Sequence, residues 1–353
     1  MAPVTERGAG VHVVVADPMQ VRLAEQLTAE VGEGVSWDFS SAHTPEALPG
    51  ALVRADVFVG SKLPPSATAQ ADALRLVQVA GAGYEGIDLA GLRPGTIVAN
   101  TTHHGRAIAE YCVMAMLALH RQLLVEDADL RAGRWRSVFQ DPDAPVHRTL
   151  VGQTVGIVGY GEIGQHVAEL CHALGMRVIA TRRRPTPAPP ADWIGGPDEL
   201  PRLLRDSDVV VVTVPLSDET VGLLDAAMLA ELRPSAFLIN VSRGPVVDET
   251  ALHAALTGGR LAGAAIDVWW RYPTSGRQGA PANLPFHELT NVIMTPHTSG
   301  VTHDVFTNRM RDVAANIRAL RDGQPLRNVV HQSPPEPTGV LDAALHLPVG
   351  GTR

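Results

Sequence analysis

The sequence predicts an α/β fold with parallel sheets. Short apolar runs alternate with helix-like segments along most of the 353 residues. That alternation is typical of parallel strands whose two faces are covered by helices. A glycine-rich turn between a predicted strand and a predicted helix supports the same fold class. At about 100–200 residues per domain, the length predicts two or three domains.

The first part of the chain predicts a small α/β unit. Its expected strands are Val11–Ala16, Ala55–Gly60, Leu74–Val79 and Thr96–Asn100, with helical spacing over Val21–Val31. A long helix is expected from about Ala107 to Leu130, because apolar residues recur there three and four positions apart. Those residues are Ile108, Tyr111, Cys112, Ala115, Leu119 and Leu123.

The second part predicts a larger parallel sheet, because its apolar runs are separated by helical segments. The expected strands are Thr154–Val158, Arg177–Ala180, Val209–Val214, Ala236–Val241, Ala262–Val268 and Asn291–Thr295. A last helix is expected over Thr302–Asp322. The residues beyond Val330 are rich in Pro and Gly, which predicts a loose tail.

The composition argues against several classes of protein. Lys and Arg number 29 and Asp and Glu 37, giving a formal net charge of −8. Such a chain has no global attraction to nucleic acid or anionic membranes, so neither is expected as a partner. Its cysteines, Cys112 and Cys171, lie in apolar helical stretches, which indicates buried free thiols in a reducing compartment. With neither a secretion signal nor a run of about 18–20 apolar residues, a soluble cytoplasmic protein is expected.

A glycine loop predicts a dinucleotide site in a Rossmann-type domain. The loop fits G-x-G-x-x-G and comprises Gly159, Tyr160, Gly161, Glu162, Ile163 and Gly164. Gly159 permits a tight turn, Gly161 lets the backbone approach a pyrophosphate, and Gly164 lets the helix pack closely on the strand. The positive end of the helix dipole would face the phosphates. The alternative interpretation is a structural glycine turn without a ligand.

Basic residues follow the next predicted strand, in the order Thr181, Arg182, Arg183, Arg184. Arg182 lies 18 residues after Gly164. NAD-binding folds usually carry an acidic residue about 20 residues on, where it binds the ribose hydroxyls. A carboxylate would repel a 2′-phosphate, whereas arginines can bind it with paired N–H donors. The pattern favours NADP(H) over NAD(H); the alternative is a solvated basic turn, with the discrimination made elsewhere.

Several motifs together resemble the D-isomer-specific 2-hydroxyacid dehydrogenase family. Beside the glycine loop they are Gly81–Leu89 (GAGYEGIDL), Ile108–Glu110 (IAE), Asn240–Glu249 (NVSRGPVVDE), Ala262–Val268 (AGAAIDV) and Thr295–His297 (TPH). Their order and spacing match the family over about residues 11–330. The resemblance implies a doubly wound nucleotide-binding domain, residues 102–299, inserted into a smaller flavodoxin-like substrate domain. That domain would comprise residues 1–101 and 300–330, followed by a tail, residues 331–353.

The resemblance also implies a reaction and residues for it. It implies an oxidoreductase that transfers a hydride between NAD(P)(H) and a small 2-oxo or 2-hydroxy acid of D configuration, without a metal. Arg243 matches the arginine that binds carboxylate and carbonyl, and His297 matches the acid/base. Pro215 and Asp267 match cofactor contacts. The backbone N–H groups of Ala82 and Gly83 match the loop that binds the substrate carboxylate, and the long helix matches a dimer interface.

One position departs from the family. Most members carry a glutamate five residues after the aspartate of the DV motif, where this chain has Tyr272. A neutral phenol can orient an imidazole but cannot stabilise an imidazolium with a full charge. Our hypothesis is that Tyr272 orients His297. The alternative is that the alignment is shifted beside Trp269 and Trp270 and that another acid, such as Glu288, serves.

Other functions remain as alternatives on the same fold. Formate enzymes carry a glutamine at the position of Tyr272 and an asparagine near His104, and phosphite enzymes carry a lysine where this chain has Glu85. A dinucleotide-sensing scaffold without catalysis is a further alternative, which the presence of both Arg243 and His297 disfavours. His103, His104 and His303 are secondary candidates for the same cleft. Glyoxylate, hydroxypyruvate and larger 2-oxo acids all fit the sequence.

Overall fold

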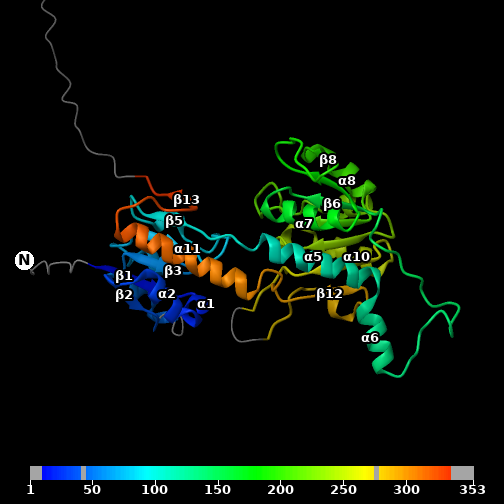
Figure 1. Cartoon of the computed structure of the whole chain (residues 1–353), viewed down its shortest axis with the longest axis horizontal. Coiled ribbons are helices and arrows are strands. Elements are labelled where there is room, and N and C mark those ends of the chain that lie inside the picture. The colour runs from blue at the N-terminus through cyan, green and yellow to red at the C-terminus, as the bar shows by residue number, and fades with distance from the viewer. Residues whose placement is uncertain (1–9, 41–44, 274–277, 335–353) are drawn as a thin grey trace, which may run out of the picture. The chain divides into compact units, whose positions relative to one another are not determined.

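The computed structural model describes residues 10–40, 45–273 and 278–334 (Figure 1). The chain divides into two compact units. The first comprises residues 1–102 and 306–353, and the second comprises residues 103–305. The sequence predicted a change of domain after residues 101 and 299.

The first unit is built on a six-stranded sheet with the order β13-β5-β4-β3-β1-β2. Its strands are β1 (Val11–Val15), β2 (Val35–Asp38), β3 (Val57–Val59), β4 (Leu76–Gln78), β5 (Ile97–Ala99) and β13 (Val329–Gln332). All neighbours are parallel except β13, which runs antiparallel to β5. The order 2-1-3-4-5 of the parallel strands is the flavodoxin-like one, so this part of the predicted fold class is confirmed.

Helices cover both faces of this sheet. They are α1 (Pro18–Arg22), α2 (Ala24–Val31), α3 (Leu48–Leu52), α4 (Pro65–Thr68) and α11 (His303–Arg321), with short 3₁₀ turns at Pro45–Ala47 and Leu89–Gly91. Val13 and Val15 of β1 pack in the same apolar cluster as α2 and α11, whereas Val14 packs in the cluster that holds α3 and α4. Because alternate residues of a strand point to opposite faces, both faces need apolar residues, which explains the continuous VHVVV run.

The second unit contains a seven-stranded parallel sheet with the order β12-β11-β10-β9-β6-β7-β8. Its strands are β6 (Thr154–Val158), β7 (Arg177–Thr181), β8 (Trp193–Gly195), β9 (Val209–Val212), β10 (Phe237–Asn240), β11 (Gly263–Ile266) and β12 (Val292–Met294). Counted from β6, the order is 3-2-1-4-5-6-7, which is a doubly wound Rossmann-type sheet. The predicted fold class is therefore confirmed here too.

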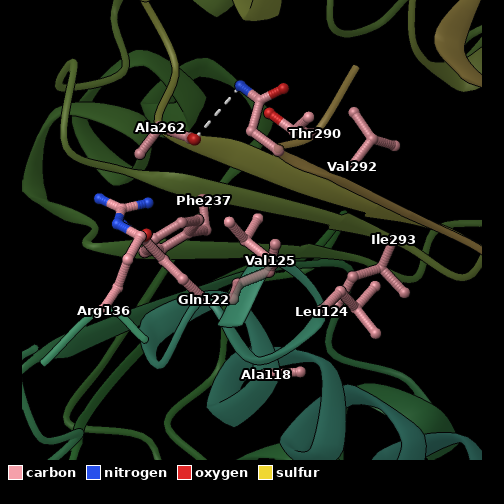
Figure 2. Close-up of a pocket in the computed structure, with 12 residues that line it drawn as sticks. Ala118, Gln122, Leu124, Val125, Arg136, Phe237, Ala262, Thr290, Val292 and Ile293 are labelled. Atoms are coloured by element: carbon pink, nitrogen blue, oxygen red, sulfur yellow. Dashed lines mark hydrogen bonds between the residues drawn. The ribbon is translucent and has the colours of Figure 1, made fainter. Parts of the chain in front are cut away.

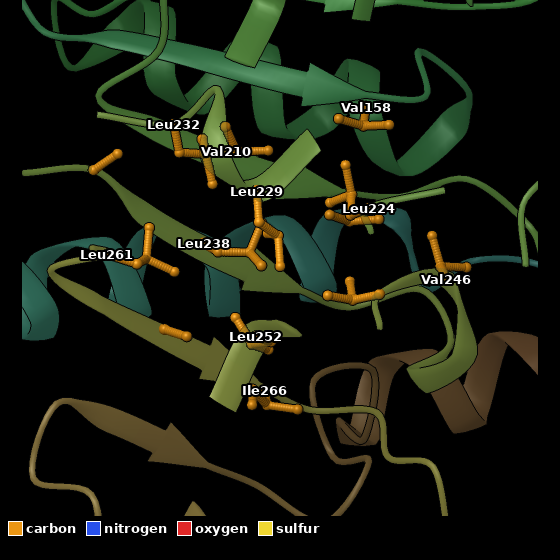
Figure 3. Close-up of a cluster of buried hydrophobic side chains, with 14 of the residues drawn as sticks. Val158, Val210, Leu224, Leu229, Leu232, Leu238, Val246, Leu252, Leu261 and Ile266 are labelled. Carbon is orange, nitrogen blue, oxygen red and sulfur yellow. The ribbon is translucent and has the colours of Figure 1, made fainter. Parts of the chain in front are cut away.

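The helices of the second unit are α5 (Gly105–His120), α6 (Leu123–Arg131), α7 (Glu162–Ala173), α8 (Leu200–Asp206), α9 (Ala226–Ala230) and α10 (Glu249–Thr257), with 3₁₀ turns at Pro197–Glu199, Gly244–Val246 and Phe286–Glu288. All of these helices except α6 pack in one of two apolar layers. One layer holds α8, α9 and α10 over side chains such as Val210 and Leu238 (Figure 3). The other holds α5 and α7 over Val211 and Ile239.

The predicted long helix is wrong, because the structure breaks it into α5 and α6 with a bend of 58°. Gln122, at the break, has a left-handed φ of 47°. Unlike α5, α6 has no buried residue, so no apolar face holds it against the sheet. Leu123, which was expected on the buried stripe, is 54% exposed.

The sequence prediction also missed three strands. They are β2, β8 and β13, each of which lies at the edge of its sheet. The predicted tail began at residue 331, but His331 and Gln332 belong to β13 and pair with β5; the rest of that tail, beyond residue 334, lies outside the described residues. Among the described residues no single helix is long and apolar enough to span a membrane, although the bent pair α5 and α6 passes by length and composition.

Candidate active site

The glycine loop follows β6 and leads into α7. Gly159 has a φ of 102°, which side-chain-bearing residues rarely adopt. A Cβ on Gly164 would lie 2.3 Å from the carbonyl oxygen of Gly159, so any side chain would push α7 off the strand. A Cβ on Gly161 would meet nothing within 4 Å. The loop therefore has a tight turn, close helix packing and open space beside its backbone, as a bound pyrophosphate requires.

A cavity of about 1110 Å³ opens beside this loop. Its lining residues come from the glycine loop, the basic turn after β7 and the turn after β9: Gly159, Tyr160, Gly161, Arg182, Arg183, Arg184, Thr186, Thr213, Val214, Pro215, Ser217, Asp218, Glu219 and Thr220. The structure thus brings the predicted glycines, arginines and Pro215 together. Of the other predicted cofactor residues, Glu162, Ile163 and Gly164 form the first turn of α7 and Thr181 is buried at the end of β7.

The segment that follows the basic turn is bonded to the glycine loop. The Tyr160 hydroxyl donates to the carbonyl oxygen of Ala188 at 3.1 Å. Arg182 Nε donates to the carbonyl oxygen of Arg184 at 2.9 Å, whereas the side chains of Arg183 and Arg184 are exposed. Sequence reasoning missed two cavity-lining carboxylates, Asp218 and Glu219. The wall of the cavity therefore carries charges of both signs.

Three predicted catalytic residues follow three neighbouring strands of the same sheet. Arg243 comes after β10, Tyr272 after β11 and His297 after β12. All three lie beyond the carboxyl ends of parallel strands, where α/β sheets hold their ligands. The Arg243 backbone is extended, its carbonyl oxygen accepts from Asn240 Nδ2 at 3.1 Å, and its guanidinium donates to the Ser242 carbonyl oxygen at 2.8 Å.

Tyr272 contacts His297 directly. The phenol oxygen lies 3.1 Å from His297 Nδ1, and it accepts a bond from the Trp269 backbone N–H at 3.3 Å. Burial raises the pKa of the Tyr272 phenol, against the opposing influence of the Trp269 N–H and the Arg243 guanidinium. The phenol is therefore neutral at physiological pH. Glu288, the alternative partner, has a 69% exposed side chain that lies 4.0 Å from His287.

Asp267 is fully buried behind the histidine loop. Its carboxylate accepts three bonds: from the Thr295 hydroxyl at 2.6 Å, the Thr298 N–H at 2.8 Å and the Ser299 N–H at 3.0 Å. Its carbonyl oxygen accepts the N–H of His297 at 2.8 Å. In this structure Asp267 therefore anchors the loop that carries His297. Its assignment to the nicotinamide end of a cofactor stays a prediction.

The remaining candidates belong to other parts of the chain. Ala82 and Gly83 belong to the first unit, in the loop after β4, where the Ala82 carbonyl oxygen accepts from Asn100 Nδ2 at 2.8 Å. The exposed His303 lies 3.7 Å from Asp304. Both cysteines are buried, and burial raises the pKa of Cys171 to about 12, so these thiols are unreactive. Within the described ranges, no group of three or more His, Cys, Asp or Glu is arranged to hold a metal ion.

The chain is similar to known dehydrogenases along most of its length. Residues 113–299 match the family described as "D-isomer specific 2-hydroxyacid dehydrogenase, NAD binding domain". D-3-phosphoglycerate dehydrogenase of Mycobacterium tuberculosis is 32% identical over 90% of this chain, which spans 58% of that enzyme's length. Glycerate dehydrogenase of Methylorubrum extorquens is 32% identical over 83% of this chain and 91% of its own length.

A solved structure shows the same architecture. The crystal structure of a D-isomer specific 2-hydroxyacid dehydrogenase family protein from Aeromonas salmonicida aligns with a TM-score of 0.78 and 25% identity, covering 91% of this chain and 99% of that one. Sequence motifs, both sheet orders and these matches agree. The chain belongs to the D-isomer specific 2-hydroxyacid dehydrogenase family.

Proposed function

We propose that this protein reduces the C2 carbonyl of a small 2-oxo acid to a D-2-hydroxy acid, using a reduced nicotinamide dinucleotide. One observation carries the proposal: Arg243 and the Tyr272–His297 pair lie at the same sheet edge as a cavity built by the glycine loop. The test is oxidation of NADPH and NADH at neutral pH with glyoxylate, hydroxypyruvate and larger 2-oxo acids. Cofactor binding without turnover of any of them would contradict the proposal.

Arg243 and His297 have different roles in the reaction. The bound cofactor supplies the hydride for C2. The Arg243 guanidinium, a planar fork of donors, binds the substrate carboxylate and polarises the carbonyl as negative charge develops on its oxygen. The His297 imidazolium donates a proton to that oxygen and becomes neutral imidazole.

Tyr272 can serve both protonation states of His297. Its oxygen has two lone pairs: one accepts the Trp269 N–H, and the other can accept an N–H at His297 Nδ1. Nδ1 then keeps its proton in both protonation states of the ring, and the proton exchanged with the substrate is the one on Nε2.

We expect the pH profile of Tyr272→Glu to differ from that of the wild type, because a carboxylate then lies beside His297 in place of the phenol. Reduction needs imidazolium, so its rate falls as pH rises through the pKa of His297. A carboxylate beside the ring favours the charged form, and the descending limb of the reduction rate moves up by about one pH unit. Arg243 and Asp267 are the other charged groups that act on this site. The account would be contradicted if the wild-type reduction rate did not fall well above pH 8 and Tyr272→Phe had the same pH profile.

We propose that the enzyme prefers NADPH, on the support of the basic turn in the cavity wall. Arg182→Asp is expected to weaken NADPH binding about 10- to 100-fold, the value of a charge-assisted hydrogen bond, and to leave NADH binding within about threefold. Fluorescence titration with both cofactors measures this. Arg177→Asp, at the opposite end of the same strand, is the matched control. Equal affinity of the wild type for the two cofactors would contradict the preference, and an unchanged NADPH affinity of Arg182→Asp would mean that other residues bind the 2′-phosphate.

We propose a homodimer, formed by an apolar surface on α5, α6 and the segment that follows. Of the sixteen exposed large hydrophobic residues in the described part of the chain, ten lie there: Met114, Leu117, Leu123, Leu124, Leu130, Trp135, Val138, Phe139, Val146 and Val151. Beside them is a pocket of about 370 Å³, in which Gln122, Leu124 and Val125 at the α5–α6 bend lie near Phe237 and Ile293 (Figure 2). A second copy of the chain is the occupant that would cover this surface.

Light scattering tests the dimer. We expect about twice the 37.5 kDa chain mass for the wild type and one chain mass for the double variant Leu124→Asp/Phe139→Asp. Charges at an apolar contact must be desolvated, which opposes association. Val53→Asp, at an exposed apolar position of the first unit, is the control and should stay dimeric. A monomeric wild type at micromolar concentration would refute the assignment.

A further inference from the structure

Tyr111 is a polar residue on the buried face of α5, as is His120 in the last turn of the helix. The helical neighbours of Tyr111 on that face, among them Ile108 and Cys112, are apolar and pack in the layer over β6, β9 and β11. Tyr111 is 9% exposed, and a phenylalanine would fill the same space. A buried hydroxyl needs a partner, and this one finds it 184 residues away, in the Thr295 hydroxyl at 2.7 Å.

The direction of these hydrogen bonds follows from Asp267, the acceptor at the end of the series Tyr111, Thr295, Asp267. An ionised carboxylate only accepts, so the Thr295 hydroxyl must donate its one proton to Asp267 Oδ1. Its oxygen can then only accept from Tyr111, which makes the Tyr111 O–H the donor. Burial raises the pKa of Tyr111 to about 12, so the phenol keeps this proton throughout the physiological range.

This series of hydrogen bonds ends at the backbone of His297, the proposed acid/base. Asp267 also accepts the N–H groups of Thr298 and Ser299, and its carbonyl oxygen accepts the N–H of His297. His297 has a φ of 58°, a left-handed conformation that a residue with a side chain keeps only where its surroundings enforce it. The side chain of His297 is oriented by Tyr272, and its backbone is held from the other side by Asp267.

We propose that Tyr111 is a positioning residue whose hydroxyl fixes the Thr295 hydroxyl on Asp267 and thereby holds His297 in its left-handed conformation. Its effect on turnover rests on the proposed function. α5 thus does more than cover the sheet, because one of its side chains sets the geometry of a loop more than 180 residues further along the chain.

The test is a double-mutant cycle in the full chain. Tyr111→Phe is expected to lower kcat about tenfold and to leave KM and the cofactor Kd within about twofold, because a small misplacement of the proton donor slows the chemical step without altering binding. Thr295→Val, which removes the hydroxyl at constant shape, should lose at least as much. The double variant should be no slower than Thr295→Val, since both changes break one chain of bonds. Thr295→Ser, which keeps the hydroxyl, should restore most of the activity.

A second readout does not depend on turnover. In ¹⁵N-histidine NMR spectra, the ring signal of His297, identified by its loss in His297→Asn, should be single in the wild type and broadened or doubled in Tyr111→Phe. Thr257→Val removes a hydroxyl that bonds only within α10 and is the matched control for both measurements. Wild-type kcat and an unchanged His297 signal in Tyr111→Phe would overturn the proposal, as would additive losses in the cycle. If no 2-oxo acid is turned over, the proposed function fails, and the NMR comparison still decides the role of Tyr111.

Discussion

Replacing His297 with asparagine is expected to lower kcat for 2-oxo acid reduction by about 10³-fold, because general acid catalysis contributes about 10²–10⁴-fold. Asparagine is the informative substitution at this position. It tolerates the left-handed φ of 58° better than most residues with a side chain, so the loop and its bonds to Asp267 should survive. It cannot donate a proton at neutral pH. The cofactor Kd, measured by fluorescence titration, should stay within about twofold of wild type.

His172→Asn is the control for this change, since His172 is exposed in the last turn of α7. It should be fully active. A His297→Asn variant that keeps more than about a tenth of wild-type kcat would show that another group protonates the alkoxide. Steady-state kinetics with saturating cofactor decide between these outcomes.

Replacing Arg243 with lysine is expected to lower kcat/KM by about 10²–10³-fold, the usual cost of removing a preorganised donor from developing negative charge. Lysine keeps the charge but loses the planar fork that binds carboxylate and carbonyl together. The backbone should be preserved, because the contact of its carbonyl oxygen with Asn240 does not involve the guanidinium. Both KM and kcat should change, since the same group binds the ground state and stabilises the transition state.

Arg205→Lys is the matched control, because Arg205 is an exposed residue of α8 that pairs with Glu231. Its kinetics should match the wild type. Kinetics of Arg243→Lys within about threefold of wild type would mean that the substrate carboxylate is bound by other residues. His297→Asn and Arg243→Lys together distinguish loss of the proton donor, which leaves KM unchanged, from loss of the anion site, which raises KM.

Local sequence patterns predicted most of the fold, and the errors have physical causes. Central strands such as β9 are buried on both faces, so their continuous valines are visible in the sequence. The edge strands β2 and β8 lack such runs and were missed. The break at Gln122 was also missed, because the apolar spacing continues through Leu123 although the helix does not.

The residues of the candidate site also differ in whether the sequence could predict them. Arg243, His297 and the glycine loop stand in local motifs, and Tyr272 was found by its distance from Asp267. Tyr111 could not be found, because its bond to Thr295 joins residues 184 positions apart and leaves no spacing pattern. The anchoring of the Tyr272 segment was hidden for the same reason: the Trp269 indole donates to the Thr295 carbonyl oxygen and the Trp270 indole to that of Val247.

The most direct test of the central claim is a deuterium-transfer experiment. The full chain is incubated with reduced cofactor deuterated at nicotinamide C4 and with hydroxypyruvate, and the product is analysed by mass spectrometry and chiral chromatography. The account predicts D-glycerate with one deuterium at C2, formed by the wild type and strongly reduced in His297→Asn and Arg243→Lys. A deuterated product formed equally well by both variants would contradict the account, because hydride transfer would then not depend on the site described.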